Sequence, residues 1–172
     1  MLIDRGRSQL LLIDIQSKLA PHVANGGTVV ANCTRLATYA RRLGVPTTLT
    51  EHYPKGLGPT AAPVLEALGN DVPRFAKIAF SSWKDDAIRA RIEGLKEDGL
   101  DQVVVAGMEA HVCVGQTSLD LLANGLAHAM QASATSPYAG SNGPVPTSSP
   151  TRWSPSNGSG GATRRSSRIS SR

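Results

Sequence analysis

Three residues with chemically useful side chains interrupt apolar stretches of the sequence. Asp14 lies inside the run LLLIDI, Lys77 lies inside RFAKIAF, and Cys113 closes the segment GMEAHVC. A thiolate is a nucleophile, and a nearby ammonium or a helix N-terminus favours it, while a carboxylate accepts the proton of the thiol. These residue types predict a cysteine nucleophile with Asp14 as its base and Lys77 as the charge partner.

Each of the three residues also has an ordinary structural interpretation. A single aspartate at a strand end is often a turn residue, a single lysine is usually solvated, and a single cysteine commonly fills a core. The other cysteine, Cys33, fits that last description because it lies on the apolar stripe of a predicted helix, and we assign it a packing role. The chemical interpretation therefore depends on whether the fold brings Asp14, Lys77 and Cys113 together.

The hydrophobic pattern alternates between short apolar or β-branched runs and longer segments with apolar residues three and four apart. Runs of the first kind are typical of buried strands, and segments of the second kind are typical of amphipathic helices. The predicted strands are residues 10–15, 45–50, 74–80 and 102–106, and the predicted helices are 28–43, 64–68, 84–98 and the segment after Cys113, with a Pro- and Gly-rich loop over 50–60.

This alternation predicts an α/β fold with three αβα layers around a parallel sheet and right-handed crossovers. Asp14, Lys77 and Cys113 each stand at or just after the end of a predicted strand. The carboxyl ends of parallel strands lie along one edge of the sheet, where ligand sites are built. The three side chains are therefore expected to converge.

Composition divides the chain near Leu126. All 13 acidic residues precede residue 121, and residues 127–172 hold twelve Ser, five Pro and five Gly, so the net charge of +5 comes from five arginines beyond residue 150. Two interpretations stay open: a natural, disordered, low-complexity basic tail, or a sequence that leaves its reading frame near Gly125. In both cases we expect one domain over residues 1–126 and a tail over residues 127–172.

The same composition disfavours several other functional classes. No apolar run is long enough to span a bilayer and no secretory signal is recognisable, which predicts a cytoplasmic protein without membrane contact. The two cysteines lack CxxC or metal-ligand spacing, so no disulfide framework or zinc site is expected. The arginines of the tail suggest nucleic-acid binding as a competing function. Because no aromatic residues are interleaved with them, we do not expect a nucleic-acid partner.

The motifs resemble those of a known family. LLLIDIQ around Asp14, FAKIAFSSW around Lys77 and GMEAHVCVGQTSLDLL around Cys113 are similar to the three motifs of the isochorismatase-like cysteine hydrolases, which include nicotinamidases and other amidases. The loop TEHYPKGLGPT further resembles the branch called isochorismatase domain-containing proteins. The resemblance covers about residues 8 to 125.

The resemblance implies a Rossmann-like sheet of six parallel strands in the order 3-2-1-4-5-6, and hydrolysis of a small amide-like C–N bond through a thioester. It implies that Asp14 is the general base, Lys77 the charge partner and Cys113 the nucleophile. It also implies a cis peptide at Met108–Glu109, which would aim the backbone N–H groups of Glu109 and Cys113 at one point as an oxyanion hole.

The resemblance bears on cofactors and on the pocket as well. Nicotinamidases hold a metal with an aspartate and two histidines, whereas this loop offers only Glu51 and His52, so neither a metal nor a cofactor is expected. His111 is given a packing role rather than a part in a Cys–His dyad. The family implies a small-molecule substrate and, if the fold is complete, a homo-oligomer. Three aromatic residues are candidates for lining the pocket, or otherwise for packing in the core: Tyr53, Phe80 and Trp83.

The sequence departs from the family pattern after the cysteine helix. Members of the family continue with a fifth strand, a helix and a sixth strand, whereas residues after Leu126 lack the apolar runs expected of such strands. We therefore expect both strands to be missing and the strand over 102–106 to become an unprotected edge. A catalytically impaired or non-enzymatic family member stays open as the alternative to an active hydrolase.

Overall fold

The computed structural model describes residues 2–69 and 71–132, and these residues form an α/β fold built on one sheet. The strands run in the order β3-β2-β1-β4-β5, and every neighbouring pair is parallel. This order agrees with the one that the family resemblance implies for the first five strands. The strands are β1 (Ser8–Ile13), β2 (Thr47–His52), β3 (Arg74–Lys77), β4 (Gln102–Gly107) and β5 (Ala127–Ala132).

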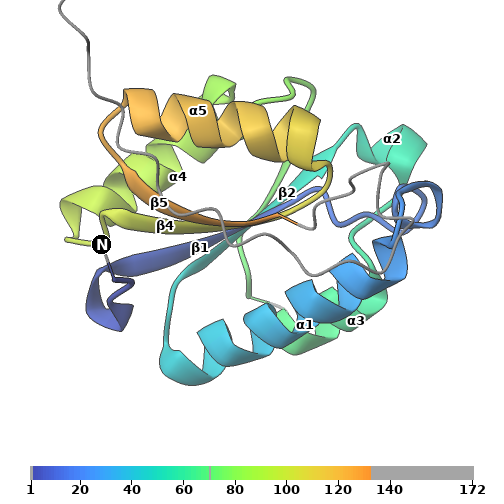
Figure 1. The fold of residues 1–172 in the computed structure, drawn as a ribbon, viewed down its shortest axis with the longest axis horizontal. Helices are drawn as coiled ribbons and strands as arrows, with labels where there is room; N and C mark the ends of the chain where they lie inside the picture. The colour runs from blue at the N-terminus through green and yellow to red at the C-terminus, as the bar shows by residue number, and fades with distance from the viewer. Residues whose placement is uncertain (1, 70, 133–172) are drawn as a thin grey trace, which may run out of the picture. The chain divides into compact units, whose positions relative to one another are not determined.

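Helices cover both faces of the sheet, which confirms the predicted αβα layers. In Figure 1, α1 (Gly26–Leu43) and α3 (Ala62–Leu68) lie on one face, and α4 (Asp86–Glu97) and α5 (Gly115–Ala123) lie on the other. A single helical turn, α2 (Pro54–Leu57), follows β2. The remaining turns are 3-10 helices at Arg5–Arg7, Ala20–His22 and Ser82–Lys84, and a π-helical turn at Ala110–Val114.

The central strand β1 is buried along its whole length, which accounts for the apolar run over residues 10–13. Its side chains alternate between two separate cores because successive residues of a strand point to opposite faces. Cys33 lies in the first core, where the sequence placed it. The first core includes Leu10, Leu12, Val29, Cys33 and Ala37, and the second includes Leu11, Ile13, Ile88, Ile92 and Leu121.

Three predicted boundaries differ from the observed ones near the carboxyl ends of the strands. The strand predicted over 10–15 ends at Ile13. The predicted strand over 74–80 ends at Lys77, because the ammonium group of Lys77 binds the carbonyl oxygens of Ala79 and Phe80 and so holds the following residues in a turn. The predicted loop over 50–60 begins as part of β2, which continues to His52, and it contains the turn α2.

The expectation that no strand follows Leu126 is wrong for residues 127–132. These residues form β5, which pairs with β4 from Gln102 opposite Ala127 to Gly107 opposite Ala132, so β4 is not an edge strand. A ladder uses backbone N–H and C=O groups, and a large apolar side chain at every position is not needed to form it. The expected boundary at residue 126 therefore falls just before a strand, and the tail beyond 132, with any sixth strand, lies outside the described residues.

The entry into β5 explains how a segment without the apolar run of a typical buried strand reaches the sheet. Gly125 adopts a positive φ of 71°, which favours glycine, and it turns the chain after α5. Leu126 is then fully buried in the core beside α5, and its N–H bonds the carbonyl oxygen of Leu121. This anchor places the next residues alongside β4.

None of the helices in the described part of the chain combines the length and the apolar character needed to cross a membrane.

Candidate active site

The carboxyl ends of β1, β2 and β3 bring together a buried ion pair. Asp14 follows β1 in a left-handed conformation with φ of 55°, and its N–H bonds the carbonyl oxygen of Thr50. Lys77 Nζ lies 2.6 Å from Asp14 Oδ2, and the Thr50 hydroxyl donates to Asp14 Oδ1 at 2.7 Å. The residues Asp14 and Lys77 are 0% and 2% exposed. A charge pair this deeply buried persists only when its hydrogen bonds are satisfied.

The ammonium group of Lys77 uses its donors within the protein. Besides Asp14, it meets the carbonyl oxygens of Ala79 and Phe80, each at 3.2 Å. An ammonium has three N–H donors, so three oxygen acceptors satisfy it fully. Lys77 therefore orders the turn that follows β3 as well as the carboxylate.

Cys113 lies beside this pair, in the π-helical turn between β4 and α5. The residue is 7% exposed, and its thiol is within hydrogen-bonding reach of both Asp14 and Lys77. The pKa of Cys113 is raised to about 12, chiefly by burial and next by the Asp14 charge, while the Lys77 charge acts in the opposite direction. Lys77 thus favours the thiolate, as expected, but burial and the carboxylate outweigh its effect in the resting site.

The backbone before Cys113 is fixed against β1. The peptide bond Met108–Glu109 is cis, as the family resemblance implies, and the N–H of Met108 bonds the carbonyl oxygen of Ile13 at 2.9 Å. Gly107 leaves no room for a side chain, because a Cβ there would lie 2.0 Å from that same carbonyl oxygen. The close approach of the two strand ends sets Cys113 next to Asp14. Glu109 and Cys113 stand at the start and near the end of the same turn.

A polar network, which the sequence did not reveal, joins the turn after Lys77 to the cysteine helix. The Thr117 hydroxyl donates to the carbonyl oxygen of Cys113 at 2.6 Å and accepts from the N–H of Ser82 at 2.9 Å. The Ser81 hydroxyl donates to Asp120 at 2.7 Å. The spacing of four residues from Cys113 to Thr117 is the one signal that could have indicated the first contact, whereas the others join segments distant in sequence.

The three candidate pocket residues have different surroundings. Trp83 is 7% exposed and packs in the core that also contains Cys113. Tyr53 and Phe80 are half exposed, and Tyr53 lines a pocket of about 580 Å³ together with Lys77 and the rim lysines Lys55 and Lys84. The Phe80 ring lies 5.5 Å from the ring of His52.

The carboxylate of Glu51, near the end of β2, has a structural role. Glu51 accepts hydrogen bonds from both the N–H and the hydroxyl of Thr60, at 2.8 and 2.7 Å. Within the described part of the chain, no three His, Cys, Asp or Glu side chains gather in a way that could hold a metal ion.

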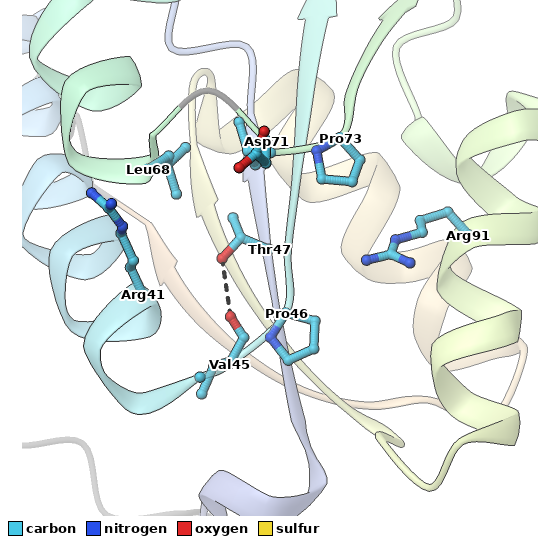
Figure 2. Close-up of a pocket in the computed structure, with 10 residues that line it drawn as sticks. Arg41, Val45, Pro46, Thr47, Leu68, Asp71, Pro73 and Arg91 are labelled. Atoms are coloured by element: carbon cyan, nitrogen blue, oxygen red, sulfur yellow. Dashed lines mark hydrogen bonds between the residues drawn. The ribbon is translucent and has the colours of Figure 1, made fainter.

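A second pocket, of about 300 Å³, lies far from the ion pair. It is lined by residues at the start of β2 and just before β3, including Thr47 and Pro73, with Arg41 and Arg91 at its sides (Figure 2). These are the amino ends of the strands, whereas Asp14 and Lys77 stand at the carboxyl ends. This pocket is therefore no part of the site around Cys113.

Comparison with known proteins gives a consistent result. The model of a family described as the isochorismatase domain matches residues 8–142. Isochorismatase domain-containing protein 2 of Bos taurus is 40% identical over 121 residues, which make up 70% of this chain and 55% of that protein. The protein of the same name from Danio rerio is 38% identical over 119 residues, or 69% of this chain and 57% of that protein. The chain thus spans about half the length of the curated relatives it matches.

Solved structures share the fold. The MAR1 ribonuclease from Caenorhabditis elegans has a TM-score of 0.68 at 35% identity, covering 76% of this chain and 65% of that one. The YcaC gene product of Escherichia coli, described as an octameric hydrolase of unknown specificity, also has a TM-score of 0.68, at 23% identity, covering 74% of this chain and 63% of that one. At that identity, the likeness to YcaC shows the fold alone.

Proposed function

Since this chain belongs to the isochorismatase family, whose hydrolase fold it shares, we propose that it is a cysteine hydrolase acting on a small amide-like C–N bond. Cys113 is the nucleophile, Asp14 the general base and Lys77 the charge partner. The observation that carries this proposal is the convergence of these three buried side chains at the carboxyl edge of the sheet.

The chemistry begins with a protonated thiol. The Cys113 sulfur attacks the carbonyl carbon while Asp14 removes the thiol proton, because a pKa of about 12 leaves little thiolate near neutral pH. The carbonyl oxygen becomes an oxyanion and pairs with the backbone N–H groups of Glu109 and Cys113. The C–N bond then breaks, the amine leaves with the proton held by Asp14, and a thioester remains.

Water completes the reaction. Asp14, again a carboxylate, removes a proton from a water molecule that attacks the thioester carbon. The C–S bond breaks, the proton returns to the Cys113 sulfur, and the carboxylic acid is released. The sum is amide plus water giving acid plus amine. Lys77 offsets the negative charge that moves between the sulfur and the carboxylate.

Release of ammonia from a panel of small primary amides tests the proposal. The Cys113→Ala variant should lose release entirely, while Cys33→Ala should retain it, because Cys33 packs in the opposite core. Release that persists in Cys113→Ala would contradict the assignment of the nucleophile. Wild-type protein that is folded but inert toward the whole panel would favour the alternative of an impaired or non-enzymatic family member.

The name of the Caenorhabditis elegans relative makes ribonuclease activity a second candidate. Phosphodiester cleavage calls for cations that are free to meet phosphate oxygens. Here the donors of Lys77, the cation beside Cys113, are engaged by oxygens of the protein, so only Lys55 and Lys84 of the neighbouring pocket could meet a phosphate, which makes this the weaker candidate. Cleavage of RNA by the wild type but not by Cys113→Ala would reverse this preference.

A homo-oligomer and a cytoplasmic location stay predictions. Leu119 and Leu122 of α5 are exposed apolar side chains, which favours self-association through that helix. Light scattering after size-exclusion chromatography would measure the oligomeric state.

A further inference from the structure

The donors of the ion pair at the centre of the site are engaged by groups of the protein itself. Each of the three donors of Lys77 meets an oxygen of the protein, and the second oxygen of Asp14 accepts from Thr50. Polar parts of a substrate, other than the carbonyl oxygen under attack, must therefore be recognised by other residues.

His52 lies directly beside this pair. It is the last residue of β2 and is paired in register with Lys77 of β3. It stands two residues after Thr50, so both side chains point to the same face of the strand, and Thr50 contacts Asp14. The Phe80 ring packs against the imidazole at a centroid distance of 5.5 Å and an interplanar angle of 37°.

The imidazole of His52 has an unused polar atom. Its Nδ1 is buried and makes no hydrogen bond to any part of the chain that the structure describes. The backbone at this position is nevertheless fixed, since the N–H of His52 donates to the side chain of the fully buried Gln16 at 2.8 Å. Buried polar atoms in native proteins nearly always have a partner, so an orphan atom beside the ion pair calls for one.

Electrostatics define what that partner is. Burial lowers the pKa of His52, the Lys77 charge lowers it further, and the Asp14 charge opposes this. A lowered pKa favours the neutral ring, in which one nitrogen donates and the other accepts. A cationic group beside it would face Lys77 and an anionic group would face Asp14, so an uncharged polar group fits best.

We propose that His52 is a specificity-determining residue that binds, through Nδ1, an uncharged polar group of the substrate beside the bond that Cys113 attacks. This proposal rests on the proposed hydrolase function and names its substrate class: small amides that carry a second neutral hydrogen-bonding group, such as a hydroxyl or another amide.

Two alkylating probes of matched length test it. N-(2-hydroxyethyl)iodoacetamide and N-propyliodoacetamide differ by a hydroxyl in place of a methyl, and their reaction with Cys113 is followed by mass spectrometry, with each rate divided by the rate with glutathione. The hydroxyl probe should react faster in the wild type by about 3- to 10-fold, the range that one neutral hydrogen bond supports. The ratio within one variant cancels any change in the reactivity of the thiol itself.

Two variants then separate binding from structure. His52→Leu should bring the ratio close to unity, whereas His52→Asn should keep most of it, because the asparagine amide places a polar atom where Nδ1 lies. An unchanged ratio in His52→Leu, or no preference in the wild type, would overturn the role of His52. Failure of both probes to modify Cys113 under conditions in which Cys33 reacts would instead overturn the proposed function.

Nitrogen NMR of the unaltered chain gives a second test that does not depend on variants folding. The ¹⁵N signal of His52 Nδ1 should move when Cys113 carries the hydroxyethyl probe and should stay when it carries the propyl probe. Equal signals in the two adducts would contradict the contact.

Discussion

At the scale of single residues, the two cysteines show why thiol acidity alone does not identify a nucleophile. Burial raises the pKa of each thiol to about 12. Among the described residues, Cys33 packs in an apolar core, whereas Cys113 has a carboxylate and an ammonium within hydrogen-bonding reach. The proposed mechanism therefore depends on a base that removes the proton during attack, rather than on a thiolate present beforehand.

The pH dependence of alkylation follows from these neighbours. In a Cys33→Ala background, the rate of Cys113 modification by iodoacetamide should keep rising above pH 9, because the thiol titrates near 12 instead of 9.0. Asp14→Asn should move the rise to lower pH, since the carboxylate raises the pKa of the thiol, and Lys77→Met should move it to higher pH. A plateau below pH 9 in the parent, or shifts of the opposite sign, would show that the three groups do not interact in this way.

The stability of the buried pair provides a separate prediction. Lys77→Met leaves the Asp14 carboxylate buried without its ammonium partner, and loss of one member of such a pair lowers the free energy of unfolding by about 3 to 5 kcal/mol. The double variant Lys77→Met, Asp14→Asn removes the charge as well and should recover part of this loss. Urea unfolding of both variants measures the difference, and equal stabilities would mean that the carboxylate alone is well tolerated.

At the scale of elements, the site depends on the junction between the turn after β3 and helix α5. Thr117 joins the two, because its hydroxyl contacts both Cys113 and Ser82. The sequence of neither segment fixes its position relative to the other. The Thr117 contact between α5 and the turn after β3 therefore helps to set the position of Cys113 relative to Lys77.

Replacing the Thr117 hydroxyl should lower activity more than the loss of its two hydrogen bonds alone would. Thr117→Val leaves the Ser82 N–H buried without a partner, which destabilises by about 1 to 3 kcal/mol, and it should lower the turnover of any small amide substrate by displacing Cys113. Thr38→Val is the matched control, since its hydroxyl also bonds a backbone carbonyl one helical turn back but lies in α1. Comparable turnover in the two variants would show that Thr117 has no positioning role.

Elements with strong periodic patterns could be predicted from the sequence, and those shaped by tertiary contacts could not. The apolar run of β1 and the stripe of α1 have local signals, so both were found within a few residues. By contrast, β5 has no apolar pattern. It forms because the backbone N–H and C=O groups along one edge of β4 are available for pairing beside the buried Leu126. Asp14, Lys77 and Cys113 stood out as polar residues in apolar contexts, but the raised thiol pKa and the role of Thr117 depend on burial and distant partners.

At the scale of the whole molecule, the described sheet ends in β5, and this strand protects the one that leads to the cysteine. β4 is bordered by β1 on one side and by β5 on the other. Its carboxyl end carries Gly107 and the cis peptide, so disorder in β4 would reach Cys113 directly. The integrity of the site therefore depends on residues that follow the cysteine helix by only a few positions.

Truncation tests this dependence. The free energy of unfolding of a chain that ends at Leu126 should be several kcal/mol lower than that of a chain that ends at Ala132, because each lost ladder hydrogen bond is worth about 1 kcal/mol. The shorter chain should therefore unfold at a lower urea concentration. It should also associate, because the edge of β4 is exposed. Chromatography at rising protein concentration would reveal the association. If the two chains are equally stable and both are monomeric, β5 contributes little to the fold.

Locating the acyl group during turnover tests the central claim most directly. The protein is mixed with 4-nitrophenyl acetate, an activated acyl donor, quenched in acid within the first turnovers, digested and examined by mass spectrometry. The account predicts an acetyl thioester on the peptide that contains Cys113, its accumulation in wild type and Cys33→Ala, and its absence in Cys113→Ala. Acetylation at Cys33 in preference to Cys113, or 4-nitrophenol release that continues undiminished in Cys113→Ala, would contradict it.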